Sequence, residues 1–501
     1  MGWGQLHRSS LTNKARFAFA AMLAGVVLAV PVTASARGIS TGFLDPGQIS
    51  HQSFAVPPSV AMDKTAEAGG TYVRIYLYWS AVAPTTKPSD QTDPNAYDWA
   101  EGGLQANVNA AHTAGLRVML NVRSAPAYAQ RGKPDGRGTH DPSPAMLANF
   151  IKAATARFPD VHLWGIWNEP NSPQFLTPQY RNGKLVSPTL YKNLLKAAAP
   201  AVYNGHPLNK IVAGETSPFG HKPPQGHNPG PLAFLRKLLC MSGRSSPKPT
   251  SCNPHLKADY WTTHPYTSGS PWRHAFSADD VSFGDVPAWK RLVSRAVKAR
   301  HLRNRSGGKN VGYWLDEFSW DTKPSDPEAV PVQLHARWTA EALYRSWTFG
   351  VGALLWGQLR DYPLAAAPYQ SGLYYCDTTP KIADACTPNV NPQPDSAKPA
   401  LRAFKFPFVA YASNGRIKIW GRTPQSNSVP VVIQRRTSSG WKHFANASPD
   451  GNGIFAKSIS SRRKTGFLRA TVASYESQRF SLVRPKERFV NPFGCGGGIP
   501  C

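Results

Sequence analysis

The sequence predicts a (β/α)8 TIM barrel followed by a small all-β sandwich domain of the immunoglobulin-like kind. Short apolar runs alternate eight times with longer helical patterns between residue 38 and about residue 387. Beyond a proline-rich stretch the hydrophobic period changes to two, which is typical of strands. The length of 501 residues, with 41% hydrophobic and 17% charged side chains, allows a large core and excludes a disordered chain.

Eight short apolar segments are the candidate barrel strands. The patterns between them have helical spacing, as in the run from Met146 to Phe158 and in the run from Leu334 to Trp347. An open doubly wound sheet is the alternative, but no GxGxxG loop follows the first strand to support it. The expected strands cover residues 42–44, 72–77, 117–122, 162–167, 211–215, 260–264, 313–317 and 353–356.

The first 36 residues have the pattern of a signal peptide. Arg8, Lys14 and Arg16 precede an apolar run of about fourteen residues, and small residues at 34–36 suit a cleavage site. This run is short for a membrane span. We therefore expect a secreted, extracellular protein without stable membrane insertion, and an uncleaved anchor is the alternative.

Six cysteines fit an exported chain. They fall into three close pairs, and although fifteen connectivities are possible, loop-closure entropy favours the three local bridges. No pair has zinc spacing with nearby histidines, so structural disulfides are expected rather than a metal. The pairs are Cys240 with Cys252, Cys376 with Cys386 and Cys495 with Cys501.

The barrel domain is expected to cover residues 37–386 and to be followed by a proline-rich linker at 387–400. Residues 401–490 are then predicted to form a basic β-sandwich domain, and residues 491–501 a glycine-rich tail. The expected strands of this second domain are 416–420, 429–434, 454–458, 467–472 and 480–483.

Two acidic motifs end candidate strands on the same side of the predicted barrel. Asn168 and Glu169 stand in the string WGIWNEPN, and Glu317 stands in YWLDEF, 148 residues later and three strands further around. Barrel enzymes carry their chemistry at the carboxyl ends of the strands. A pair of glutamates at these two places is a much stronger signal than either motif alone.

At these positions the chain resembles the clan A (β/α)8-barrel retaining glycoside hydrolases, in particular glycoside hydrolase families 5 and 39. The resemblance covers most of residues 40–375. It implies that Glu169 is the acid/base, that Glu317 is the nucleophile and that Asn168 contacts the sugar. The strand-three end departs from family 5, because residues 121–126 contain no histidine.

The resemblance extends to four supporting residues expected to bind substrate or to hold the nucleophile. Arg74 is similar to the strand-two arginine, His264 and Tyr266 to the strand-six pair, and Trp356 to the strand-eight tryptophan that floors the sugar subsite. Plain packing or a structural ion pair is the alternative for each. Four further aromatic residues in strand-end loops are candidates for lining outer sugar subsites, and loop packing is the alternative for each. They are Trp79, Tyr128, Trp167 and Trp320.

The expected roles also follow from acetal chemistry. Two carboxylates about 5–5.5 Å apart allow covalent attack and retention of configuration. Arg74 and Tyr266 should keep Glu317 ionised, whereas the negative charge nearby should keep Glu169 protonated. Asp316 competes with Glu317, and strand alternation leaves only one of the two facing the mouth. Glu215 also ends a strand and is unassigned, with a substrate contact as one interpretation.

The chain is strongly basic, with 57 Lys and Arg against 29 Asp and Glu and a net charge of +28. Residues 401–501 hold 17 of these basic residues and three acidic ones. This balance suits an anionic cell-wall polymer as a partner, and a solvated surface is the alternative. No nucleic-acid motif accompanies it.

Together these features predict a secreted, monomeric retaining glycoside hydrolase that needs no cofactor and acts on a carbohydrate substrate. A β-linked glucan, mannan, xylan or xyloside is expected from the resemblance, with an α-L-arabinofuranoside as the alternative. Two other functions remain open: a non-catalytic carbohydrate-binding barrel, and a transglycosylase that uses the same site.

Overall fold

In the computed structural model, the described residues are 37–46, 49, 56–221, 227–323, 326, 328–362, 370–375, 395–424 and 429–490. Several sequence predictions lie outside them. These are the signal peptide at 1–36, most of the linker, the glycine-rich tail and the two cysteine pairs after residue 375.

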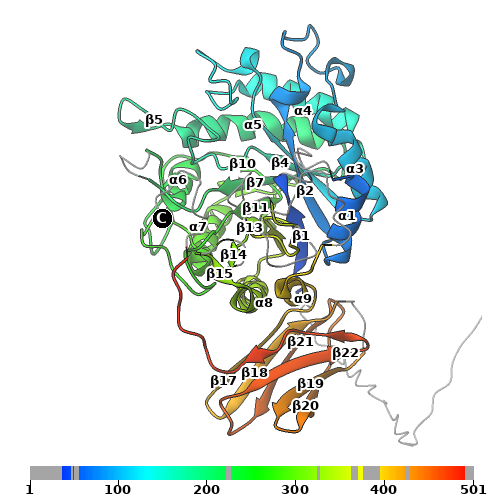
Figure 1. Cartoon of the computed structure of the whole chain (residues 1–501). Coiled ribbons are helices and arrows are strands. Elements are labelled where there is room, and N and C mark those ends of the chain that lie inside the picture. Colours follow the sequence, from blue (N-terminus) through cyan, green and yellow to red (C-terminus); the bar gives the residue numbers. More distant parts are fainter. Residues whose placement is uncertain are drawn as a thin grey trace, which may run out of the picture. The chain divides into compact units, whose positions relative to one another are not determined.

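Eight parallel strands close into a barrel, which confirms the predicted fold class (Figure 1). Strands that follow one another along the barrel sequence are neighbours, and the last strand pairs with the first. The carboxyl ends of all eight strands therefore meet at one mouth. The strands are β1 (Ser40–Leu44), β2 (Tyr72–Tyr78), β3 (Arg117–Arg123), β4 (Leu163–Ile166), β7 (Lys210–Thr216), β11 (Tyr260–Thr263), β13 (Gly312–Phe318) and β16 (Ala353–Trp356).

Helices surround the barrel and cover the apolar outer faces of its strands (Figure 1). In α4 the cause is visible in the sequence: the Ser143 hydroxyl accepts the Met146 N–H, Pro144 takes the first position, and Leu147, Phe150 and Ile151 are buried on one side. The helices are α1 (Pro58–Glu67), α2 (Trp79–Val82), α3 (Leu104–Thr113), α4 (Pro144–Arg157), α5 (Ser187–Gly205), α6 (Pro231–Leu238), α7 (Val286–Lys298), α8 (Val332–Phe349) and α9 (Pro399–Lys405).

Short elements occupy the connections. The 3-10 turns are η2 (Pro94–Ala96), η3 (Glu101–Gly103), η4 (Ala127–Ala129) and η5 (Phe283–Asp285). The two-residue strands are β5 (Tyr180–Arg181), β6 (Lys184–Leu185), β8 (Met241–Ser242), β9 (Lys248–Pro249), β10 (Leu256–Lys257), β12 (Leu302–Arg303), β14 (Thr322–Lys323) and β15 (Val330–Pro331).

The interior of the barrel has an apolar floor below a polar layer. Tyr72, Met119, Trp314 and Leu355 belong to a separate buried cluster that fills the floor. Because side chains on one face of a strand recur every second residue, Arg74 on β2 follows Tyr72 toward the mouth. The floor thus supports the side chains that meet at the carboxyl ends of the strands.

A small β domain of antiparallel strands follows, coloured orange to red in Figure 1, as the change of period predicts. Its first sheet is β17 (Phe408–Ser413), β18 (Arg416–Arg422) and β21 (Ile454–Ser460). Its second sheet is β20 (Gly440–Ala447), β19 (Val431–Thr437), β22 (Phe467–Val472) and β23 (Tyr475–Glu476), with β24 (Phe480–Ser481) pairing to β22. The sequence prediction missed β17 and β20, and the immunoglobulin-like assignment stays a prediction.

Helices α8 and α9 lie where the barrel and the β domain pack together. The boundary expected at residue 401 falls inside α9, which packs against α8. Aromatic rings of α8 and of the first β sheet then meet: Tyr344 lies 5.7 Å from Tyr411, and Trp347 lies 5.7 Å from Trp420. Arg337 of α8 also donates to the Ser481 carbonyl at 2.8 Å. Both domains thus share one continuous core.

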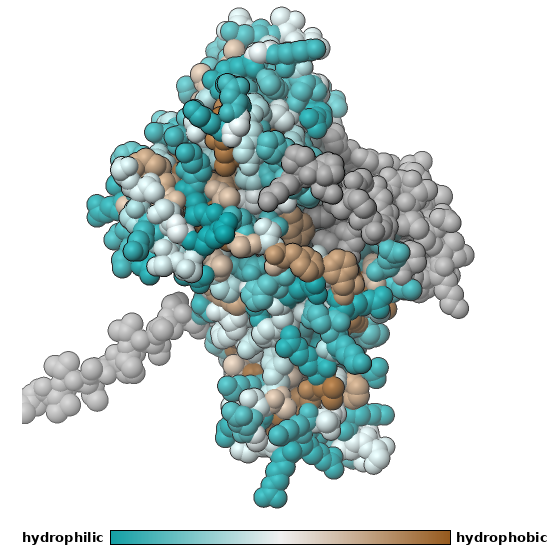
Figure 2. Space-filling model, turned by 90° about the vertical axis from the view of Figure 1, so that its left-hand side faces the viewer, coloured by the Kyte–Doolittle hydropathy of each residue, from teal (hydrophilic) through white to brown (hydrophobic). Residues whose placement is uncertain are grey.

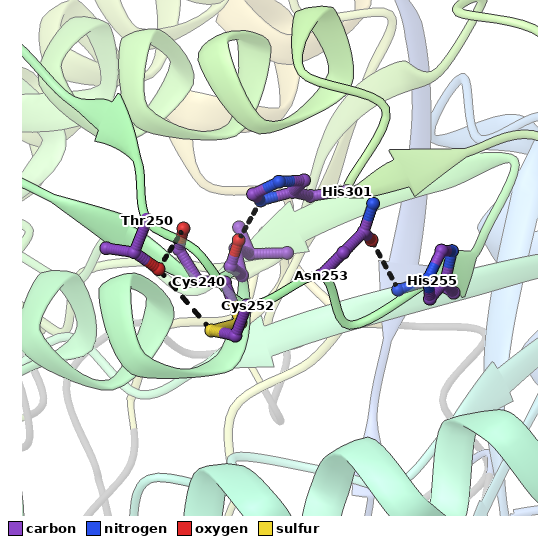
Figure 3. Close-up of a disulfide and its surroundings, with 7 residues drawn as sticks. Cys240, Thr250, Cys252, Asn253, His255 and His301 are labelled. Atoms are coloured by element: carbon purple, nitrogen blue, oxygen red, sulfur yellow. Dashed lines mark hydrogen bonds between the residues drawn. A yellow bond between two sulfur atoms is a disulfide. The ribbon is translucent and has the colours of Figure 1, made fainter.

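Cys240 and Cys252 form a disulfide, as the spacing predicts (Figure 3). The Thr250 hydroxyl donates to the Cys240 carbonyl at 3.0 Å and lies 3.4 Å from Cys252 Sγ. His301 contacts the Leu239 carbonyl beside it at 2.8 Å. The bridge closes the loop between α6 and β10.

The face of the molecule seen in Figure 2 is largely hydrophilic, and its hydrophobic residues form small separate groups. Over the described part of the chain, none of the helices combines the length and the apolar character that crossing a bilayer requires.

Candidate active site

Glu169 and Glu317 meet at the mouth of the barrel. Glu169 follows β4, and Glu317 is the penultimate residue of β13. One carboxylate oxygen of each, together with a ring nitrogen of His264, lie within 4.8 Å of one another. Their side chains are 14% and 17% exposed, whereas the side chains of Arg74 and His264 beneath them are 0% exposed. The two acids are therefore the part of this cluster that solvent reaches.

The backbone around Glu169 is held in an uncommon conformation. Trp167 and Glu169 have φ angles of 69° and 37°, in the left-handed region that non-glycine residues seldom adopt. The Glu169 N–H donates to the Glu215 carbonyl at 2.9 Å, and the Trp167 indole donates to the Phe175 carbonyl at 2.7 Å. Such conformations persist where surrounding contacts enforce them, often at active sites. Here they direct the Glu169 carboxylate across the mouth.

Three donors hold the Glu317 carboxylate. Oε2 accepts from Arg74 Nη1 at 2.8 Å and from the Tyr76 hydroxyl at 3.0 Å, and Oε1 accepts from the Tyr266 hydroxyl at 3.2 Å. Burial acts to raise the pKa of this carboxyl, but the charges of His264 and Arg74 outweigh burial and lower the pKa below its usual value. Glu317 is thus the ionised member of the pair.

Glu169 has the opposite environment. Burial raises the pKa of its carboxyl and the charge of Glu317 adds to the rise, although a hydrogen bond with His264 Nδ1 at 2.9 Å opposes it. Glu169 is thus the member that holds a proton more readily. Two carboxyl groups pushed apart in this way suit one acid and one nucleophile.

Asn168 also joins this cluster. Its Oδ1 accepts from Arg74 Nη2 at 2.7 Å, and the residue is 1% exposed. Six of the seven predicted site residues therefore lie in one contact network. They are Arg74, Asn168, Glu169, His264, Tyr266 and Glu317.

The structure places Trp356 elsewhere. Ala353 and Leu355 of β16 face the barrel interior, so Trp356 points to the opposite face, toward the surrounding helices. Its ring is fully buried against His335, and its indole donates to the Ser371 carbonyl at 2.7 Å. In this position it offers no open floor for a sugar, which corrects the expectation drawn from the resemblance.

The loop aromatics expected as outer subsites lie mostly inside the protein. Trp79, Trp167 and Trp320 are at most 1% exposed, and Tyr128 is half-buried. Trp79 stacks on Phe150 of α4 at 5.2 Å. Loop packing therefore explains the three tryptophans.

Sequence reasoning missed part of the buried layer beneath the pair. Glu215 is 0% exposed, its Oε2 lies 2.5 Å from Arg74 Nη2, and it accepts from Asn121 Nδ2 at 2.8 Å. Burial raises the pKa of Glu215 to about 8 against the influence of Arg74. Because it is buried, Glu215 is a partner of Arg74 rather than a substrate contact. Tyr76, which the spacing of inward residues on β2 could have indicated, completes the Glu317 environment.

A β-bulge on β13 explains why Asp316 and Glu317 both point into the barrel, although strict alternation would place only one of them there. Leu315 and Phe318 of β13 pair with Leu354 and Trp356, so three steps on one strand match two on the other. Asp316 continues the inward face of Trp314, and the bulge brings Glu317 to the mouth as well. A second bulge on β7, at Gly214 and Glu215, similarly turns Glu215 inward.

The acidic groups are close enough to consider a bound cation. The two sets with ligand atoms within 4.8 Å are Glu169, His264 and Glu317, and Glu215, His264 and Asp316. Arg74 already contacts Glu215, Glu317 and, at 3.6 Å, Asp316. The donor set is that of an ion-pair network around a guanidinium, and we assign no metal to it.

The fold is similar to that of a solved family 39 glycoside hydrolase from the gut symbiont Bacteroides cellulosilyticus WH2. The TM-score is 0.51 at 15% identity, and the match covers 85% of this chain and 79% of that one. A GH30 endoxylanase from Clostridium papyrosolvens C71 aligns with a TM-score of 0.43 at 12% identity over 85% and 94% of the two chains. No family model and no curated protein matches the chain. The likeness to the family 39 structure establishes the barrel fold.

Proposed function

We propose that this protein is a retaining glycoside hydrolase in which Glu317 is the nucleophile and Glu169 is the acid/base. The observation that carries the proposal is the separation of the two carboxylates, with one oxygen of each within 4.8 Å. Retaining enzymes hold the pair about 5–5.5 Å apart, whereas inverting enzymes need about 6.5–9.5 Å to admit a water. The difference in protonation between the two acids supports the same assignment.

In the first step Glu169 donates its proton to the leaving glycosidic oxygen while a Glu317 oxygen bonds to the anomeric carbon. Esterification removes the negative charge of Glu317, which lowers the affinity of Glu169 for a proton. Glu169 then acts as the base that activates water, and water releases the sugar from Glu317 with retained configuration.

Arg74, Tyr76 and Tyr266 hold Glu317 for attack, and Asn168 is held beside it. The substrate is a carbohydrate with an O-glycosidic bond. A β-linked glucan, mannan, xylan or xyloside is the proposed class, and an α-L-arabinofuranoside is the second candidate.

A panel of chromogenic glycosides and polysaccharides tests catalysis and identifies the sugar together. On the substrate found, Glu317→Gln and Glu169→Gln should each lower kcat by at least about 10²–10⁴-fold, the usual contribution of a positioned acid or base. Glu101→Gln, on the exposed turn η3, is the matched control and should keep full activity. Near-normal turnover by either active-site variant would remove that residue from the mechanism.

The stereochemistry of the first product separates retention from inversion. Proton NMR of the anomeric signal during early turnover should show the configuration of the substrate. The inverted anomer would contradict the nucleophile role of Glu317. Added azide should restore turnover to Glu169→Ala and yield a glycosyl azide of retained configuration, because the small anion replaces the base-activated water.

Two other functions are outcomes of the same experiments. A non-catalytic binder would retain a sugar without releasing product, and a transglycosylase would transfer the glycosyl group to a sugar hydroxyl at high acceptor concentration. We also propose export through the leader at residues 1–36 and a monomeric mature protein. Amino-terminal sequencing of the secreted protein and its mass in solution test these two points.

The basic β domain supports a second proposal, that it holds an anionic cell-wall polymer. Arg416, Arg462 and Arg463 are exposed at one end of the first sheet. Arg435 reaches the same end, where its Nη2 donates to Ser461 Oγ at 3.3 Å. Burial and the charge of Arg463 lower the pKa of Arg435, so these cations crowd one another. A polyanion would relieve that repulsion.

Binding of the full chain to polygalacturonate measures this interaction. Retention should weaken sharply as salt rises, and the double variant Arg462→Glu/Arg463→Glu should weaken it far more than Lys442→Glu, an exposed change on β20. Salt-independent retention, or equal effects of the two changes, would reject the proposal.

A further inference from the structure

His264 lies between carboxylates on both sides of its ring. Nδ1 is 2.9 Å from Glu169 Oε1 and 3.6 Å from Glu317 Oε2. Nε2 is 3.4 Å from Asp316 Oδ1. The ring is 0% exposed.

This geometry determines which form of the imidazole is favoured. A neutral imidazole carries one N–H, so the lone pair of its other nitrogen would face an ionised carboxylate, either Glu317 at Nδ1 or Asp316 at Nε2. The doubly protonated ring presents an N–H to each side and adds a positive charge between the acids. The arrangement therefore favours the imidazolium.

Asp316 is fixed independently of His264. Its backbone N–H donates to Thr262 Oγ1 at 3.2 Å, and the Thr262 hydroxyl donates back to the Asp316 carboxylate. Arg74 Nε lies 3.6 Å from the other oxygen. The side chain is 0% exposed, so Asp316 reaches no substrate.

We propose that Asp316 is a positioning residue that holds His264 as a charged imidazolium directly beneath the catalytic pair. The resemblance to known hydrolases implies no role for Asp316. In the sequence, Asp316 is only the alternative to Glu317 for the place at the mouth. Its consequence for catalysis rests on the proposed function, but the state of His264 is a property of the protein alone.

The acidic groups that face His264 come from three other strands or strand ends. They are Glu169 after β4, Glu215 on β7, and Asp316 and Glu317 on β13. Arg74 on β2 contacts three of these acids, Glu215, Asp316 and Glu317. The positive charges of Arg74 and His264 balance the negative charges of Asp316 and Glu317. Burial raises the pKa values of Glu169 and Glu215, so these two acids are the ones that take up protons more readily.

The same balance links Asp316 to the reaction. Burial acts against charging the ring, yet Glu317, Asp316 and Glu169 together raise the pKa of His264 to about 10. The imidazolium favours the ionised nucleophile before attack. After esterification its charge remains beside Glu169 and favours the ionised base. Asp316 thus acts on both acids through one ring.

Nitrogen NMR of the full-length protein with ¹⁵N-labelled histidine reads the state of the ring directly. The His264 signals, identified by their loss in His264→Gln, should show a doubly protonated ring from pH 6 to pH 8. In Asp316→Asn the His264 pKa should fall by about one to three units, the usual effect of losing a nearby opposite charge.

Asp321→Asn is the matched control, since Asp321 is also buried and follows β13 but accepts from the Gln370 N–H at 3.0 Å. It should leave the His264 titration unchanged. An unchanged titration in Asp316→Asn, or an equal change in Asp321→Asn, would overturn the proposal.

A neutral His264 at pH 7 in the unaltered protein would overturn it as well, and this outcome needs no variant to fold. None of these measurements uses a substrate, so failure of the glycosidase assay and failure of this proposal are distinguishable.

Discussion

Arg74 Nη1 lies 2.8 Å from Glu317 Oε2, and the guanidinium that makes this contact is completely buried. The same side chain reaches Asn168 at 2.7 Å and Glu215 at 2.5 Å. One residue of β2 thus connects residues from three other parts of the barrel mouth. Arg74 thus holds three residues of the site in place.

Replacing Arg74 by Met should cost about 3–5 kcal/mol of unfolding free energy, because it leaves buried carboxylates without their cation. Activity should fall with it, since Glu317 loses its closest charged partner. Urea unfolding and kcat on the panel substrate measure the two effects. Arg295→Met, on the exposed side of α7, should stay within about 0.5 kcal/mol of the original protein. Equal costs for the two variants would show that the buried network adds little.

His264→Gln should move the whole pH profile of kcat/KM to higher pH. His264 lowers the pKa of Glu317, so its loss raises that pKa and moves the acidic limb upward. His264 also opposes the raised pKa of Glu169, so its loss moves the alkaline limb upward too. A profile that only drops in height, with both limbs in place, would contradict the electrostatic role of the ring.

Removing the disulfide with Cys240→Ala/Cys252→Ala should destabilise the folded protein by about 3 kcal/mol. The two cysteines are 12 residues apart, and a closed loop of this size restricts the unfolded chain by about that amount. Urea unfolding of the variant and of the original protein, both under oxidising conditions, measures the loss. A loss well below 1 kcal/mol would mean that the contacts of Thr250 and His301 suffice to hold this loop.

Gly214→Ala should destabilise the protein more than Gly115→Ala. Both glycines have positive φ, 102° and 73°, so an alanine is strained by about 1–2 kcal/mol at either position. Only at Gly214 would the added Cβ also meet packed atoms, with the Thr262 carbonyl 2.6 Å away; nothing lies within 4 Å at Gly115. Urea unfolding of both variants compares the two costs. Similar values would show that the β7 bulge relaxes freely.

Much of the architecture could be predicted because it follows from local patterns. The apolar runs from Tyr72 and Arg117 became β2 and β3, and the eightfold repeat predicted the closed barrel. The acids at 169 and 317 could be paired because parallel strands bring their carboxyl ends together. Strands β17 and β20 were missed since they lack strict alternation, as in β20, where Lys442 and His443 are both exposed.

The second layer of the site could not be predicted because it depends on where two strands depart from regular register. No local pattern marks the bulge at Asp316, and strict alternation separates two side chains that the fold brings together. Trp356 is the converse case. The resemblance to the strand-eight tryptophan predicted a place at the mouth, but Ala353 and Leu355 face the barrel interior, so Trp356, which ends the strand, faces outward.

The aromatic contact between α8 and the first β sheet has a consequence for any shortened form of this protein. A chain that ended before Phe408 would lack Tyr411 and Trp420. The rings of Tyr344 and Trp347 on α8, a helix that also packs on the barrel, would then be exposed to solvent. Such a fragment should aggregate, or lose its outer helix, before its chemistry could be assayed. The carboxyl-terminal strands therefore cover an aromatic surface of the barrel domain and keep it from solvent.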